Sequence, residues 1–247
     1  MDFSVTGAKI YYTIPGINYP VTQTVINAWI AMIIIVALCI FLTRGMQVHA
    51  RTKRQIIAEY IVGMATNLVS DNMGKKWKGF VPFIAAIFSM SAVSSLMGLT
   101  GAYSPTNDLN TFLAWSIVVF VLITFYKIKT NGFLGYLKGF TEPIVVMTPL
   151  NIISEIATPV SMAFRHFGNI ASGYVIGLLL YAALGAVSKA VLFWLPGALS
   201  TIPILQIGIP AVLNVYFGVF SGLVQPYIFC MLTMLFVSQA GETEEEA

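Results

Sequence analysis

The chain has 247 residues, of which 57% are hydrophobic and only 9% are charged, with a formal net charge of +3. Because a typical soluble domain carries about 25% charged residues, this composition indicates an integral membrane protein and excludes a large extramembrane enzyme. The basic residues gather mainly in the first half of the chain. That distribution is typical of membrane-orientation signals and does not suggest nucleic-acid binding.

The first apolar run of spanning length covers residues 25–42, and the polar and aromatic residues 1–24 before it form a predicted outer leader. Arg44, Arg51 and Arg54 follow the run directly. Cytoplasmic segments carry an excess of Lys and Arg, so this end of the span is predicted to be cytoplasmic. The N-terminus is then outside the membrane.

The middle of the chain predicts two further spans and two segments that do not cross. Residues 55–73 mix apolar and polar side chains and favour an amphipathic helix near the membrane surface. Residues 81–99 span outward and residues 112–126 return, joined by a loop with turn residues at 104–108. The stretch 133–148 is short and interrupted by Glu142-Pro143, which predicts a re-entrant or interfacial segment.

The last third predicts two long helices. The first begins at Pro149 and continues to about Gly185, which is longer than an upright span needs, so it is expected to tilt strongly. Residues 193–210 contain three prolines and are predicted as a broken connector, and residues 211–238 as the final helix. The predicted fold is an all-α polytopic bundle of about five spans plus one amphipathic or re-entrant segment. Its parts are the leader 1–24, the membrane domain 25–240 and the acidic tail 241–247, which the span count places inside.

Arg165 lies in the middle of this apolar stretch. A charged side chain at the bilayer centre costs at least about 2.5 kcal/mol, so its presence is a functional-site hypothesis. At helical spacing Ser161, Asn169 and Ser172 share one face with it. The alternative is a structural arginine that extends to a headgroup or pairs with an acid elsewhere in the bundle.

The segment Ser161-x-x-x-Arg165-x-Phe167-Gly168-Asn169 resembles the signature of the membrane-embedded a subunit of F-type ATP synthases. Further stretches resemble the same family, in the same order along the chain: Gly74-Lys75-Lys76-Trp77-Lys78 with Val81-Pro82, Met97-Gly98-Leu99, Ser104 to Thr111, Pro149 to Glu155 with Pro159, and Val224-Gln225-Pro226. The resemblance therefore covers most of the chain.

This resemblance implies a non-catalytic subunit that passes H⁺ or Na⁺ through two offset half-channels beside the rotating ring of c subunits. It implies that Arg165 faces that ring, keeps an approaching carboxylate ionised and separates the half-channels. The last two helices then form a tilted hairpin against the ring. The implied partners are the c ring, the b subunits of the peripheral stalk and the rest of the complex. The implied location is a bacterial cytoplasmic membrane, and no bound cofactor or metal is expected.

Several polar residues near Arg165 are candidates for the ion pathway. Glu155 and His166 would share a face on an unbroken helix, and we expect them to line the outer half-channel unless they form a structural pair. On the final helix, Asn214, Gly218, Ser221 and Gln225 recur as a polar stripe that can lie against the arginine helix, although ordinary interhelical hydrogen bonding would also explain Asn214 and Ser221. The candidate set is Arg165 with Ser161, Asn169, Ser172, Tyr174, Glu155, His166, Asn214, Ser221 and Gln225.

Three positions depart from common patterns of the family. His166 stands where many members carry Leu, Tyr174 where many carry an acid, and Gly218 where some carry a titratable group. A stand-alone ion channel or secondary transporter is the alternative function, and it would show ion flux from the purified chain alone. No phosphate-binding loop, zinc-protease motif or nucleophile elbow supports an enzyme acting alone.

Overall fold

The computed structural model describes residues 8–16, 18–47, 52–100, 102–142, 144–192 and 204–241. Its helices are α1 (Gln23–Thr43), α2 (Lys53–Met73), α3 (Val81–Met97), α4 (Leu109–Gly139), α5 (Thr148–Leu192) and α6 (Ile204–Ala240). Short 3-10 turns occur at η1 (Lys75–Phe80), η2 (Gly98–Thr100), η3 (Pro105–Asn107) and η4 (Val145–Met147). Within the described ranges, five helical segments are long and apolar enough to cross a membrane, and α2 is not among them. The predicted all-α polytopic fold is confirmed.

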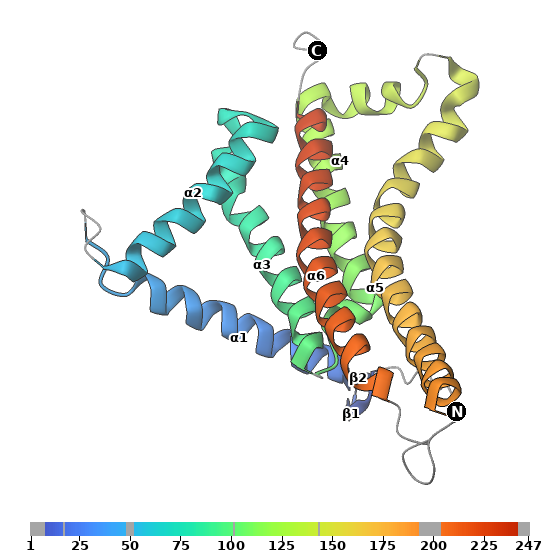
Figure 1. Cartoon of the computed structure of the whole chain (residues 1–247). Helices are drawn as coiled ribbons and strands as arrows, with labels where there is room; N and C mark the ends of the chain where they lie inside the picture. Colours follow the sequence, from blue (N-terminus) through green and yellow to red (C-terminus); the bar gives the residue numbers. More distant parts are fainter. Residues whose placement is uncertain are drawn as a thin grey trace.

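The helices pack around α6, which contacts α2, α3, α4 and α5 (Figure 1). The buried core lies where α2, η1, α3 and α4 meet the second half of α6, and it includes Val69, Trp77, Ile84, Val119 and Met234. In contrast, most apolar side chains of α1 remain exposed, as expected for a helix that faces lipid. The core therefore fixes the position of α6, and α5 packs against one side of α6.

The predicted outer leader contains a β-hairpin. The strands β1 (Ile10–Ile14) and β2 (Tyr19–Thr22) form an antiparallel hairpin directly before α1. Asn27 on α1 donates a hydrogen bond of 2.6 Å to the carbonyl oxygen of Tyr103, which ties this end to the loop between α3 and α4. The Asp108 carboxylate accepts from the Asn110 amide and caps α4, so the predicted turn chemistry of this loop is confirmed.

The helix α4 extends beyond the predicted span and bends sharply at Gly132, where φ is +72°. Positive φ is strained for residues with a Cβ, so glycine is the residue that permits this bend. Beyond it, α4 crosses the top of the molecule toward the start of α5 (Figure 1). The stretch 133–148 thus includes the last part of α4, η4 and the first residue of α5. Its position at the membrane interface stays a prediction.

The connector before the last helix is shorter than the predicted range 193–210. α6 begins at Ile204 and continues through Pro210, so it starts seven residues before the predicted position 211. Pro210 is the seventh residue of α6, beyond the first four positions whose amide groups lack intrahelical partners. The helix therefore continues through a proline at the loss of one helical hydrogen bond. Residues 193–203 and the tail 242–247 lie outside the described residues.

The two glycines Gly218 and Gly222 allow α6 to approach α3 and η2 closely. A Cβ at Gly218 would overlap the side chain of Leu99, and one at Gly222 would lie 3.3 Å from the Cβ of Ser95. At Gly218 the predicted polar stripe of α6 therefore faces η2, which follows α3. The small residue serves helix packing at that position.

We expect Gly218→Ala to be less stable than the matched variant Gly63→Ala by about 1 kcal/mol or less, because the added methyl group displaces the flexible end of Leu99, a residue that is itself 37% exposed. The matched control is Gly63→Ala on α2, where no atom lies within 4 Å of the added Cβ. Thermal unfolding of the detergent-solubilised protein measures both. Equal midpoints for the two variants would contradict the close approach at Gly218.

Candidate functional site

A polar stripe runs along the side of α5 that carries Arg165. Ser161, Asn169 and Ser172 are exposed together with Arg165, as their spacing predicts. Upstream, the stripe continues through Ser154 and Thr158 at the same helical spacing. α5 remains helical through Pro159, so the face is not interrupted there. The full stripe consists of Ser154, Thr158, Ser161, Arg165, Asn169 and Ser172.

Arg165 itself lies on the exposed side of α5 and away from the core. The buried side of the helix at this level is formed by Met162, Ala163 and His166, which are centred about 100° around the helix axis from Arg165. Among the residues that the structure describes, no acid forms an ion pair with Arg165. The charge therefore has no compensating partner in the described part of this chain, which argues against the structural alternative of a paired arginine.

Two cavities lie along α5 between Arg165 and the end of the bundle where α4 meets α5. A cavity of about 220 Å³ lies between α5 and α6 and is lined by Ser161 and Arg165. A second cavity of about 450 Å³ lies nearer the start of α5. Ser154, Thr158 and Phe236 line both cavities. Because they share these walls, the two cavities adjoin each other along α5, and together they are called the groove below.

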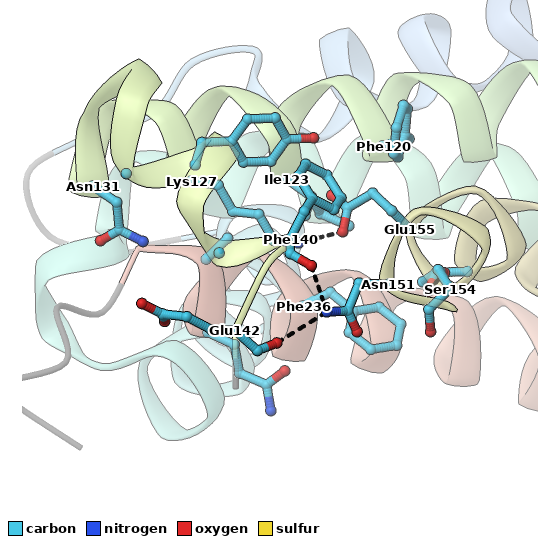
Figure 2. A pocket seen from close by; sticks show the side chains of 16 residues that line it. Phe120, Ile123, Lys127, Asn131, Phe140, Glu142, Asn151, Ser154, Glu155 and Phe236 are labelled. Atoms are coloured by element: carbon cyan, nitrogen blue, oxygen red, sulfur yellow. Dashed lines mark hydrogen bonds and ion pairs between the residues drawn. The ribbon is translucent and has the colours of Figure 1, made fainter. Parts of the chain in front are cut away.

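The larger cavity contains an ion pair between α4 and α5, shown in Figure 2. The Lys127 ammonium lies 2.6 Å from the Glu155 carboxylate, and the two side chains are 34% and 16% exposed. The side-chain amide of Asn151 donates to the carbonyl oxygens of Phe140 and Glu142 at 2.9 and 3.0 Å. These bonds hold the start of α5 against the end of α4, so the wall of the cavity does not depend on the ion pair alone.

Glu155 and His166 share a face of α5 as predicted, but the structure does not bring them together. They are three turns apart, about 16 Å along the axis, and they contact different elements. His166 is 2% exposed and stacks on Phe112 with a ring-centroid distance of 3.8 Å. Neither imidazole nitrogen has a hydrogen-bond partner in the described part of the chain. The histidine thus packs as an aromatic ring. This geometry does not support a half-channel that Glu155 and His166 line together.

The other predicted residues are only partly placed. Gln225 is 5% exposed and lies inside the bundle on α6, one to two turns before Phe229 of the core. Asn214, Ser221 and Tyr174 lie within α6 and α5, and their side chains are outside the described residues. Their place in an ion pathway stays a prediction.

Lys127, Ser154 and Thr158 are site residues that sequence reasoning missed. The two hydroxyl residues follow from extending the spacing of the stripe upstream, which the proline at position 159 discouraged. In the sequence alone, Lys127 is one of the basic residues that indicate membrane orientation. Its contact with Glu155 joins residues that are 28 positions apart, and periodicity within one helix cannot reveal such a contact.

Comparison with known proteins gives a consistent result. Residues 25–238 match the family described as ATP synthase A chain. The chain is 30% identical to the sodium ion specific ATP synthase subunit a of Propionigenium modestum, over 89% of this chain and 74% of the relative. It is 31% identical to ATP synthase subunit a 2 of a Bradyrhizobium strain, over 89% of each chain. It is also 31% identical to ATP synthase subunit a 1 of Crocosphaera subtropica, over 93% of this chain and 90% of the relative.

We expect His166→Phe to be at least as stable as the native protein, because the ring contact with Phe112 is kept and two buried ring nitrogens without partners are removed. His166→Ala is the comparison variant and should lose about 3 kcal/mol through the cavity it leaves. Thermal unfolding in detergent measures both. A strong loss of stability in His166→Phe would mean that the imidazole makes a polar contact essential to the fold.

Proposed function

This chain belongs to the ATP synthase subunit a family, and we propose that the polar stripe around Arg165 is the surface over which ions pass to and from a rotating ring of c subunits. The chain is the ion-translocating, non-catalytic membrane subunit of an F-type ATP synthase. It couples an ion gradient to ATP synthesis or hydrolysis, and the nucleotide chemistry takes place in other subunits of the complex.

The unpaired and exposed Arg165 is the observation that carries the proposal. A guanidinium within a membrane-spanning helix is costly unless an acid compensates it, and the described part of this chain supplies none. A carboxylate presented by a neighbouring subunit satisfies this requirement. Because arginine does not deprotonate in proteins, its charge favours the ionised form of every carboxylate that arrives. The carboxylate must then release its ion before it passes Arg165.

One half-channel follows the groove between α5 and α6. An ion enters the larger cavity beside Glu155, passes Ser154 and Thr158, and arrives at Ser161 and Arg165. Lys127, Lys129 and Lys138 lie on the same part of α4 as this opening, and the positive-inside rule places it on the cytoplasmic side. Glu155 therefore fits the inner half-channel, in place of the outer one predicted from its spacing to His166.

The second half-channel continues from Arg165 in the opposite direction. Asn169, Ser172 and Tyr174 on α5 and Asn214, Ser221 and Gln225 on α6 are its candidate lining residues. His166 supports this wall as a packed ring. α5 has 45 residues and is therefore about 68 Å long, more than twice the thickness of the hydrocarbon core of about 30 Å. A strongly tilted α5–α6 hairpin beside the c ring accommodates this length.

The same proposal includes the orientation of the chain in the membrane, its partner subunits and the transported ion. Its N-terminus lies outside and its C-terminus inside a bacterial cytoplasmic membrane, in keeping with the bacterial relatives. The b subunits of the peripheral stalk hold it against the rotation of the ring. The transported ion is H⁺ or Na⁺, and the relative from Propionigenium modestum is named as sodium ion specific. Pumping measured with and without Na⁺ separates the two.

We expect Arg165→Ala and Arg165→Lys each to reduce ATP-driven ion pumping at least about 100-fold in vesicles that carry the assembled complex. Alanine removes the charge, and lysine loses the planar donor geometry and the nearly permanent protonation of arginine. ATP hydrolysis by the soluble sector, released from the membrane, should stay unchanged.

The matched control is Arg54→Ala, since Arg54 lies on α2 over the ring of Phe41 and outside the stripe. It should keep pumping near the native rate. Undiminished pumping by Arg165→Ala would show that the arginine is a structural anchor and would overturn the proposed gate.

A further inference from the structure

Lys127 is the only cation that lines the larger cavity among the described residues, and it is engaged with Glu155. One carboxylate oxygen of Glu155 lies 2.6 Å from the ammonium, while the other is buried and has no hydrogen-bond partner in the described residues. Glu142, the second acid of the cavity, lies 3.5 Å from Lys138. Tyr136 also lines the cavity and interacts with the Glu155 carboxylate. The carboxylate nearest to the groove thus carries the protein's own cation on one oxygen.

The ion pair is not required to join α4 to α5. Asn151 already bridges the two elements through its two hydrogen bonds to backbone carbonyl groups, and the helices pack along their length. Lys127 also remains one-third exposed, in a cavity of about 450 Å³. Because Asn151 and the helix packing already join the two elements, the ammonium can move toward the open cavity without separating the helices.

We propose that Lys127 is a positioning residue of the inner half-channel, where its ammonium competes with the transported cation for Glu155. The inference rests on the proposed place of Glu155 in that half-channel. In the resting state the pair neutralises the carboxylate and keeps the cavity from trapping a cation. An arriving cation displaces the ammonium toward water, binds Glu155 briefly and is released into the groove when the ammonium returns. The competition therefore keeps cation binding weak enough for rapid passage.

This mechanism makes a quantitative prediction for Lys127→Met in the assembled complex. Without its competitor, the Glu155 carboxylate holds the cation more tightly, and the apparent KM for the coupling ion on the lysine side should fall about fivefold, the scale of one partly exposed ion pair. The maximal rate per assembled complex should fall as well, because release becomes slower. Lys127→Arg keeps the charge and should stay close to the native values for both quantities.

The test measures initial rates of ATP-driven pumping against the concentration of the coupling ion, in vesicles that carry the complete complex. Glu155→Gln and the double variant Lys127→Met with Glu155→Gln complete the set. If the two groups compete for one ion, the Lys127→Met substitution changes the apparent KM only while Glu155 is present. The double variant should then match Glu155→Gln, whereas two independent structural effects would add.

The outcomes distinguish a failure of the proposed place of Glu155 in the half-channel from a failure of the competition by Lys127. A native apparent KM and rate in Glu155→Gln would remove Glu155 from the ion path and overturn its place in the proposed half-channel. An impaired Glu155→Gln together with an unchanged apparent KM in Lys127→Met would overturn the competition by Lys127 alone. The same holds if Lys127→Arg behaves like Lys127→Met, since the charge would then not matter. Rates are normalised to the amount of assembled complex, so a loss of assembly cannot imitate a change in KM.

Discussion

The cost of an unpaired guanidinium in an apolar environment is the constraint on which the rest of this structure depends. Arg165 lies on a helix that is otherwise apolar over most of its length, and the described residues provide no acid to compensate it. Such a charge is tolerated only where polar groups, water or a partner reach it. The hydroxyl and amide side chains of α5 and the groove beside them meet part of this need. Under the proposed function, a carboxylate from another subunit meets the rest.

The two sides of α5 follow from this constraint. One side must hold the helix in the bundle, and it does so with Met162, Ala163 and His166 packed against α4, α6 and the α3–α4 loop. The other side must stay open to a moving partner, and it carries the polar stripe. Since α5 is continuous through Pro159, both sides keep their register from the larger cavity to Ser172. A break in the helix would have separated Arg165 from the groove that leads to it.

The sequence predicted the features that depend on one helix at a time. The apolar runs marked α1 and α3 to within a few residues, while α4, α5 and α6 extend further than predicted. The spacing of Ser161, Arg165, Asn169 and Ser172 correctly placed them on one exposed face. Features that depend on packing between helices could not be predicted in this way. The contact of Gly218 with Leu99 and the ion pair of Lys127 with Glu155 join distant parts of the chain. The stacking of His166 on Phe112 is of the same kind, and for this reason a polar residue type was mistaken for a polar environment.

The distribution of charge makes the two proposed half-channels unlike each other. On the side toward the start of α5, an ion meets Glu155 and the competing Lys127. Beyond Arg165 the sequence contains a single charged residue, Lys189, before the acidic tail begins at Glu242. An outer pathway built from amides and hydroxyls of this chain has no fixed negative charge with which to select a cation strongly. Under the proposed function, discrimination between H⁺ and Na⁺ then occurs mainly at the carboxylate of the c subunit, and this chain contributes the route, the separation at Arg165 and the release on the inner side.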